Sequence, residues 1–261
     1  MVVMNYFGCG ISDKGIKRIV NQDSIWLQIS ETNNKGQIAL AVVCDGIGGL
    51  EQGEVASSTA IEAFSDWYSN TLPEIISDLS DGSLQVEWMR LISDINARLM
   101  QYGKEQGIRL GTTMTAMFIF GGRYMIAQVG DSRAYCISDE VTQITEDHTF
   151  FTRELKAGRM NRNQLLLDPR KNRITRGVGI ADTVQPDFYF GTVGPEECVW
   201  MLCSDGLRHK ITNDEFRDAI RPENINDCHE LQTICEHLVN EVKERGEKDN
   251  ISVILIKAFN K

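Results

Sequence analysis

The stretch AVVCDGIGGLEQGEVAS at residues 41–57 places an aspartate and three glycines directly after a run of small apolar residues. Such a run is typical of a buried strand, and Asp45 would stand at its end. Gly46 leaves room for a ligand to approach the backbone, and Gly48 and Gly49 allow a tight turn before a helix. The stretch therefore predicts a strand that delivers a carboxylate beside an unobstructed backbone.

Apolar runs bounded by turn residues recur along the chain and predict further buried strands. Two of them are joined by Gly121 and Gly122, a link typical of a hairpin because glycine adopts positive φ at little cost. We therefore expect antiparallel strand pairing. With the run just described, the predicted strands occupy residues 37–45, 113–120, 123–131, 132–138, 198–206 and 251–259.

Helical spacing of apolar residues predicts amphipathic helices at 54–68 and 227–244. A further helix is expected within 84–106, and Thr212 with Glu215 forms a capping-box pattern at the start of a short one. Strands and helices of this kind pack in layers. We expect an α+β fold with two packed antiparallel β-sheets flanked by α-helices on both outer faces, an αββα sandwich.

The composition is that of an ordinary globular protein, with 42% hydrophobic and 25% charged residues in a chain of 261. Layered sheet folds reach this length as one unit, and the chain shows no internal repeat or linker. We therefore expect a single domain over residues 1–261. The segment 146–180 is polar and rich in arginine and asparagine, and we expect it to form a surface lobe.

The formal net charge of −10, from 27 basic and 37 acidic residues, opposes binding to nucleic acid or to an anionic membrane. No apolar run approaches the roughly 20 residues that span a bilayer, and the first residues lack the pattern of a secretion signal. We therefore expect a cytoplasmic protein with neither nucleic acid nor membrane as partner.

The seven cysteines show no C-x-x-C spacing, which disfavours zinc binding and redox chemistry. None is followed six residues later by arginine, so the loop of a cysteine-nucleophile phosphatase is not expected.

Asp23 in RIVNQDSIW would open a further, early strand, and with it five aspartates stand at predicted strand boundaries: Asp23, Asp45, Asp131, Asp205 and Asp249. For any one of them the alternative is a turn residue that bonds its own backbone. If the strand ends meet at one edge, carboxylates about 4 Å apart repel by roughly 4 kcal/mol per pair at an effective dielectric of 20. Such a cluster needs cations, and ligation by oxygen atoms alone suits Mg²⁺ or Mn²⁺.

Bound divalent cations lower the pKa of water and generate hydroxide at neutral pH, which is machinery for hydrolysing a phosphate ester. Gly46 would offer its backbone carbonyl to such a cation. Arg18, which lies shortly before Asp23, would hold two phosphate oxygens with its guanidinium. The alternative for Arg18 is a solvated surface residue.

Seven motifs occur in an order that resembles the metal-dependent, type 2C class of protein serine/threonine phosphatases, the PPM family, and in particular its bacterial branch. They are RIVNQD, DGIGG, GEVAS, GTTMTA, GDSRAY, SDGL and DNISV, and they run from residue 18 almost to the end of the chain. One glycine-rich turn with an aspartate is weak evidence, whereas seven ordered matches are specific. The family fold, two antiparallel sheets flanked by helices, agrees with the fold expected from the apolar runs.

The resemblance implies a site with two Mn²⁺ or Mg²⁺ ions. Asp45 would bridge both ions, Gly46 would contribute its carbonyl, and Asp205 and Asp249 would complete the ligand set. Asp131 matches a position that helps to hold a third, weaker ion in bacterial members.

Three other residues are implied to act beside the metal ions. Asp23 would act through metal-bound water, Arg18 would hold the substrate phosphate, and Asn250 would support the site by hydrogen bonding. The implied reaction is hydrolysis of phosphoserine and phosphothreonine monoesters by direct attack of a metal-bridging hydroxide. The implied partners are phosphorylated proteins, a cellular Ser/Thr kinase or its substrates among them, and we expect a monomer.

The sequence departs from the family at the general acid. Animal and many bacterial members carry a histidine at the position of Ile47 or of Leu50, so the group that protonates the leaving alkoxide is unassigned here. A metal-bound water or His148 would serve, and a structural role is the alternative for His148. The segment 146–180 corresponds to the flap of bacterial members, and its arginines would either steer a partner or be solvated.

Two other functions remain open from the sequence. A catalytically silent relative would bind phosphoproteins as a scaffold, but retention of Asp45, Asp205 and Asp249 argues against it because their repulsion would serve no purpose there. A metal-dependent phosphodiesterase or nuclease is the second, and the acidic net charge disfavours a polyanionic substrate.

Overall fold

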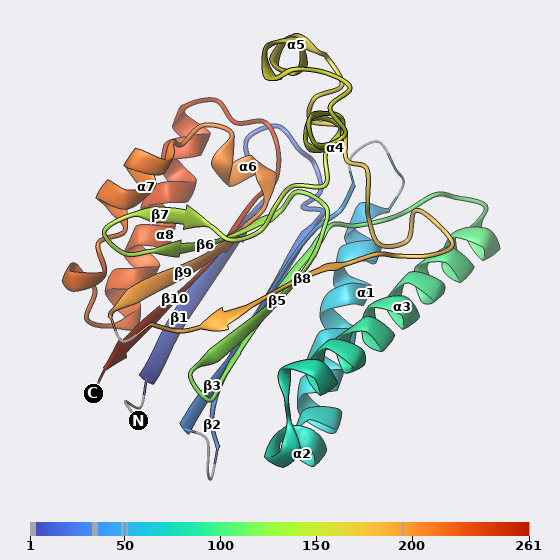
Figure 1. The fold of residues 1–261 in the computed structure, drawn as a ribbon. Helices are drawn as coiled ribbons and strands as arrows, with labels where there is room; N and C mark the ends of the chain where they lie inside the picture. Colours follow the sequence, from blue (N-terminus) through green and yellow to red (C-terminus); the bar gives the residue numbers. More distant parts are fainter. Residues whose placement is uncertain (1–3, 33–35, 48–49, 51, 195, 261) are drawn as a thin grey trace.

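Two five-stranded antiparallel sheets pack face to face, and helices cover the outer face of each (Figure 1). This architecture confirms the expected α+β sandwich. The computed structural model describes residues 4–32, 36–47, 50, 52–194 and 196–260. Gly48 and Gly49, which were expected to form the tight turn after Asp45, lie outside the described residues.

The first sheet has the strand order β1-β10-β9-β6-β7, so the first and last strands of the fold are neighbours in it. Its strands are β1 (Met4–Asp13), β6 (Arg133–Ile137), β7 (Val141–Gln143), β9 (Cys198–Cys203) and β10 (Ile251–Asn260). The second sheet has the order β2-β3-β4-β5-β8. Its strands are β2 (Asp23–Thr32), β3 (Gly36–Asp45), β4 (Met114–Phe120), β5 (Arg123–Val129) and β8 (Asp187–Thr192).

Strand β3 is covered on both faces. Ala39, Ala41 and Val43 pack against the first sheet, whereas Leu40 and Val42 pack against helices, and all five side chains are fully buried. A strand without a solvent face needs no alternation of polar and apolar residues, which explains its unbroken apolar run. Its only acidic residue, Asp45, stands at the last position of the strand.

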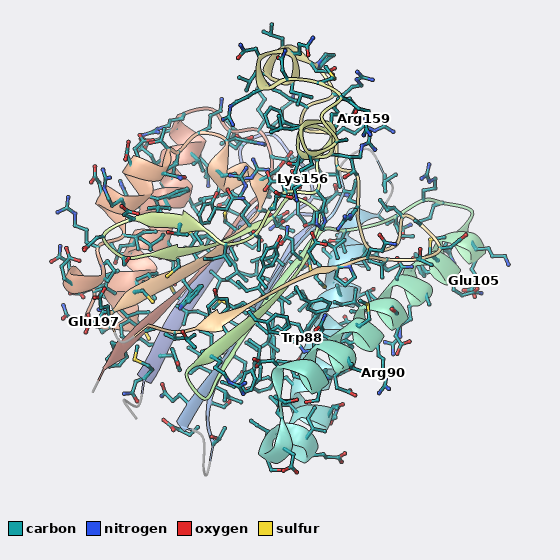
Figure 2. The ribbon with its side chains drawn as sticks, viewed as in Figure 1. Trp88, Arg90, Glu105, Lys156, Arg159 and Glu197 are labelled. Carbon is teal, nitrogen blue, oxygen red and sulfur yellow. The ribbon has the colours of Figure 1, made fainter. Side chains whose placement is uncertain are left out.

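Helices α1 (Gly53–Asp66) and α3 (Asp81–Gln106) cover the second sheet (Figure 1). Trp88 of α3 packs against Phe118 of β4, with the ring centroids 6.4 Å apart (Figure 2). Between the two helices lie a π-helical turn (Trp67–Thr71), α2 (Leu72–Ile75) and a 3₁₀ turn (Ile76–Asp78).

The first sheet is covered by helices from the C-terminal part of the chain. Thr212 caps α7 in the expected capping box with Glu215. In the described part of the chain, no helix combines the length and apolar character needed to cross a membrane. The helices on this face are α6 (Asp205–Arg208), α7 (Asn213–Ala219) and α8 (Cys228–Glu244), with a 3₁₀ turn at Pro222–Asn224.

The expected hairpin between β4 and β5 is confirmed, with positive φ angles of 54° at Gly121 and 73° at Gly122. The adjoining apolar runs 123–131 and 132–138 belong to different sheets, as β5 and β6. The chain therefore crosses from one sheet to the other around Asp131. The apolar runs did not predict β1, β2, β7 and β8, although a strand was expected to begin at Asp23, where β2 starts.

The segment 146–180 carries α4 (Phe150–Lys156) and α5 (Arg162–Leu167), which project beyond the sandwich (Figure 1). Figure 2 shows Lys156 and Arg159 on this projection. Several of its arginines pair with carboxylates of the same chain instead of being only solvated. The pairs are Arg159 with Glu154, Arg170 with Asp168 and Arg176 with Asp187.

Candidate active site

The strand pairing brings the predicted aspartates toward one end of the sandwich. Asp23 and Asp45 are register partners at the ends of β2 and β3. Asp205 opens α6 directly after β9, and Asp249 precedes β10, the strand that pairs with β9. Asp131 lies at the crossing between the sheets. The residues are far apart in the sequence, so only the tertiary fold gathers them.

The carboxylates lie close enough to affect one another's ionisation. Burial raises the pKa of Asp45 well above its usual range, and the charges of Asp23, Asp205, Asp131 and Asp249 raise it further. Burial also raises the pKa of Asp23 and of Asp131 to about 7, and in both cases Asp205 adds to the effect. A bound cation would relieve this repulsion.

Two buried carboxylate oxygens of the gathered aspartates have no hydrogen-bond partner among the described residues. Asp23 accepts a hydrogen bond from the Ser204 hydroxyl at Oδ2, 2.8 Å away, but its Oδ1 is unpaired. Asp131 accepts one from Arg208 at Oδ2, 3.0 Å away, and its Oδ1 is also unpaired. Buried oxygen atoms in this condition call for an ion or a water. Because hard divalent cations prefer oxygen ligands, the residues present fit Mn²⁺ or Mg²⁺.

Arg18 and Asp249 form a two-pronged ion pair. Arg18 Nε donates to Oδ1 of Asp249 at 2.9 Å, and its Nη2 donates to Oδ2 at 2.8 Å. In the described part of the chain, no three His, Cys, Asp or Glu side chains have the arrangement of a complete metal site. Because both of its carboxylate oxygens bond Arg18, Asp249 would have to release or share Arg18 to serve as a metal ligand.

The backbone around Asp45 is held by several hydrogen bonds. The Asp45 carbonyl accepts from the Thr113 amide at 2.8 Å and from the Thr112 hydroxyl at 2.9 Å. A Cβ at Gly46 would lie 2.6 Å from the carbonyl carbon of Gly53 and 2.8 Å from the carbonyl oxygen of Gln22. Glycine is therefore required at residue 46 by the backbone packed against it.

Asn250 anchors the loop that carries Arg18. Its Nδ2 donates to the carbonyls of Lys14 and Val20 at 3.0 and 3.1 Å, and its Oδ1 accepts from the Gln22 amide at 2.9 Å. One buried amide thus holds both ends of the loop.

Two residues near the acids were missed by the sequence analysis. Arg208, which bonds Asp131, and His209, 3.5 Å from Asp205, lie at the end of α6. Burial raises the pKa of Asp205, while His209 and Arg208 act in the opposite direction. Their spacing of three and four residues from Asp205 would bring them to one side of a helical turn, but α6 is too short for its sequence to predict a helix.

His148 is buried, and hydrogen bonds engage both nitrogens of its ring. Its Nδ1 accepts a hydrogen bond from the Gly130 amide at 3.1 Å, and its Nε2 lies 3.0 Å from Asp187 and 3.2 Å from Arg176. Because both ring nitrogens are engaged within the fold, His148 is a poor candidate for the general acid.

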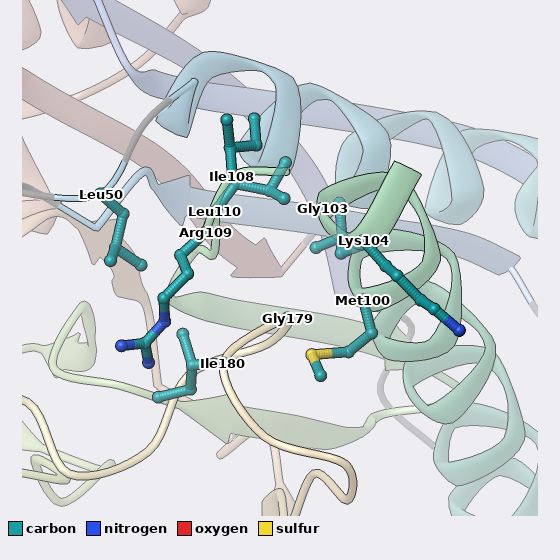
Figure 3. A pocket seen from close by; sticks show the side chains of 10 residues that line it. Leu50, Met100, Gly103, Lys104, Ile108, Arg109, Leu110, Gly179 and Ile180 are labelled. Atoms are coloured by element: carbon teal, nitrogen blue, oxygen red, sulfur yellow. The ribbon is translucent and has the colours of Figure 1, made fainter. Parts of the chain in front are cut away.

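The two positions that depart from the family pattern are apolar contacts. Ile47 donates its amide to the carbonyl of Gly111 at 2.9 Å and packs close to Gly177. Leu50 lines an apolar cavity of about 220 Å³ between the end of α3 and the end of the 146–180 segment, where Ile180 lies (Figure 3). Neither side chain can transfer a proton.

Comparisons with known proteins agree with this geometry. The family described as protein phosphatase 2C matches residues 17–251. The protein phosphatase PhpP of Streptococcus pneumoniae is 31% identical over 250 residues, which cover 94% of this chain and 95% of that protein. The serine/threonine phosphatase stp of Listeria innocua is 27% identical over 248 residues, covering 94% of this chain and 93% of that protein.

Solved structures with the same fold include phosphatases. The serine/threonine phosphatase Stp1 from Staphylococcus aureus has a TM-score of 0.79 at 27% identity, covering 100% of this chain and 96% of that one. The catalytic domain of the serine/threonine protein phosphatase PstP, solved in complex with two manganese ions, has a TM-score of 0.75 at 26% identity, and both chains are covered completely. From its fold, its ordered motifs and these matches, the chain belongs to the protein phosphatase 2C family of enzymes.

Proposed function

We propose that this protein hydrolyses phosphoserine and phosphothreonine in phosphorylated proteins, and that it requires Mn²⁺ or Mg²⁺. The observation that carries the proposal is the gathering of Asp23, Asp45, Asp131, Asp205 and Asp249 at one end of the sandwich with Arg18 among them. The names of PhpP, stp and Stp1 support the substrate class, and the two manganese ions in PstP support the cofactor.

In this proposal the metal ligands are Asp45, the carbonyl of Gly46, Asp205 and Asp249, and Asp131 helps to hold a third, weaker ion. Bound as a pair, the cations would supply an activated hydroxide for direct attack on phosphorus and would offset the negative charge of the phosphate. No covalent intermediate with the protein is involved. Asp23, held by Ser204, would orient water near the pair.

Arg18 would bind two phosphate oxygens of the substrate. Its planar guanidinium can donate two parallel hydrogen bonds to a phosphate, and it donates two such bonds to the Asp249 carboxylate in this structure. Exchange of the Asp249 carboxylate for a phosphate would then free Asp249 for the cation. Asn250 would keep Arg18 at the correct place by fixing the loop.

The remaining parts of the proposal concern the cellular setting. We propose that the enzyme is a cytoplasmic monomer with one catalytic domain, and that it opposes a Ser/Thr kinase by acting on the kinase or on its substrates. The 146–180 segment would act as a flap beside the site.

The test uses protein stripped with a chelator and supplied with Mn²⁺ or Mg²⁺. Turnover of p-nitrophenyl phosphate and of a phosphothreonine peptide should return with the metal and should be lost in Asp205→Asn. A protein that binds the peptide without any turnover would instead be a scaffold. Cleavage of a phosphodiester in preference to the monoesters would indicate a nuclease-type enzyme and would overturn the proposal.

A further inference from the structure

An exposed apolar surface flanks the residue proposed to hold the phosphate. We call residues Ile16 to Val20, which include Arg18, the 16–20 lip. Its aliphatic side chains are exposed to 57% at Ile16, 92% at Ile19 and 49% at Val20. A single exposed aliphatic residue is ordinary, but three in five residues form a patch of the kind that binds a partner.

The lip has a defined conformation because hydrogen bonds fix its two ends. Asn250 bonds the carbonyls of Lys14 and Val20, so the chain enters and leaves the lip at a set distance. Gly15 turns the chain with a φ of 74°, and its amide donates to Asp13 Oδ1 at 2.7 Å. The aliphatic side chains are therefore held outward by an anchored loop.

Residues 17–20 of the lip line a surface pocket of about 550 Å³, and Ile16 adjoins it in the chain. His209, Glu247 and Lys248 also line the pocket, and Asp249 bonds Arg18 there. A ligand in this pocket would therefore contact both the phosphate-binding arginine and the apolar lip.

The free charges of the pocket favour an anionic ligand. Lys17 and Lys248 are exposed, and within the described ranges neither ammonium group has a hydrogen-bond or ion-pair partner. Glu247 is turned inward, where it accepts hydrogen bonds from the amides of Lys248 and Asp249 at 2.7 and 3.0 Å. Lys17, Arg18 and Lys248 line the same pocket and would together attract the phosphate and other acidic groups of a substrate.

We propose that the 16–20 lip binds an apolar side chain next to the phosphorylated residue of a phosphoprotein substrate. The inference rests on the proposed function. An extended substrate advances about 3.3–3.6 Å per residue, so a residue one or two places from the phosphorylated one lies within reach of Ile19 when Arg18 holds the phosphate. Lys17 and Lys248 would attract the acidic charge of the segment, and the lip would select its apolar neighbour.

The experiment compares pairs of phosphothreonine peptides that differ only in carrying isoleucine or serine beside the phosphothreonine, on either side. The proteins are wild type, the double variant Ile16→Ser/Ile19→Ser, and Val86→Ser as a control. Val86 is 50% exposed on α3 and belongs to no part of the pocket. Each is assayed with Mn²⁺ on both peptides of a pair and on p-nitrophenyl phosphate, which has no flanking residue.

Wild type and Val86→Ser should prefer the isoleucine peptide about tenfold in kcat/KM, the scale expected for burying one aliphatic side chain. The double variant should lose this preference and keep its activity on p-nitrophenyl phosphate. A preserved preference, or an equal loss on all substrates, would overturn the inference. So would sedimentation showing that the substitutions only break a complex between two copies of the chain.

Binding separates this inference from the proposed function. Fluorescence anisotropy of labelled peptides measures their affinity for the protein and does not depend on hydrolysis. If the wild type hydrolyses none of the substrates, the proposed function is wrong. The anisotropy measurement still tests the inference in that case, because equal affinity of the wild type for the isoleucine and serine peptides would overturn the inference.

Discussion

Arg18 and Asp249 are 231 residues apart in sequence, yet the Arg18 guanidinium donates hydrogen bonds to both carboxylate oxygens of Asp249, at 2.9 and 2.8 Å. The proposed function assigns a phosphate to Arg18 and a cation to Asp249. The two residues satisfy each other as the structure stands, so each ligand has to compete with this ion pair. Cation and phosphate binding would therefore favour one another.

Replacement of Arg18 by alanine should strengthen Mn²⁺ binding and weaken phosphomonoester turnover. The substitution frees Asp249 and removes a positive charge that also interacts with Asp45 and Asp205. Because the pair is partly exposed, with side-chain exposures of 39% and 32%, the gain in affinity should be modest, about two- to fivefold. Isothermal titration calorimetry measures it. The control is Lys17→Ala, and an Arg18→Ala protein that binds Mn²⁺ no more tightly would contradict the competition.

Gly46→Ala should destabilise the protein, whereas Gly82→Ala should not. The new Cβ at residue 46 meets backbone atoms of Gly53 and Gln22 at 2.6 to 2.8 Å, and overpacking of this kind costs about 1–3 kcal/mol. Gly82 lies in α3 with nothing within 4 Å of the added atom, and alanine there should stabilise by about 0.4–1 kcal/mol. Urea unfolding of both variants gives the comparison, and equal effects would refute the steric argument.

Asn250→Ala should lower the free energy of unfolding by about 1–3 kcal/mol, since it removes three hydrogen bonds from a buried amide to the partly buried backbone of the Arg18 loop. Asn250→Asp should be no better, because a carboxylate cannot donate to the carbonyls of Lys14 and Val20. The matched control is Asn172→Ala, an exposed asparagine, which should stay within about 0.5 kcal/mol. Chemical denaturation at constant metal concentration tests the ranking, and an Asn250→Ala protein as stable as the control would reject the anchoring role.

His148 should make the protein less stable in mild acid. Burial lowers the pKa of His148, and Arg176 lowers it too, although Asp187 and Glu146 act in the opposite direction. The unfolded chain, with an ordinary pKa of about 6.5, then binds a proton more readily than the folded one. The stability contributed by neutral His148 is complete above about pH 6.5 and declines as the pH falls through the lower folded value.

His148→Gln removes this titration. It should be less stable than wild type at pH 7.5 but lose less stability between pH 7 and pH 5. Melting temperatures recorded across this range provide the measurement, with His229→Gln at an exposed site as the control. If wild type and His148→Gln lose stability in parallel on acidification, the assignment is wrong.

The central strands could be predicted because β3, β4, β5, β9 and β10 are buried and read as apolar runs. Strand β1 has half-buried positions and two glycines, and the three-residue β7 is too short for a period to appear. Strand β8 is a sheet edge with exposed Phe190, so its pattern is weak. These three strands were not predicted because they are short or lie at the edge of a sheet, and tertiary packing sets both properties.

The site was partly predictable for a related reason. Each aspartate could be recognised from its position beside a turn, and the ordered motifs then indicated that the acids meet. The pairing of Arg18 with Asp249 could not be predicted, because it joins opposite ends of the sequence. Arg208 and His209 act through the orientation of a helix of four residues, which leaves no periodic trace.

The position of β10 has a consequence for biosynthesis. It is inserted between β1 and β9, and it directly follows Asp249 and Asn250. A nascent chain on the ribosome can complete neither the first sheet nor the anchor of the Arg18 loop until β10 has emerged. Strand β1 and the loop with Arg18 must therefore wait for β10 to be synthesised before they take up the positions described here.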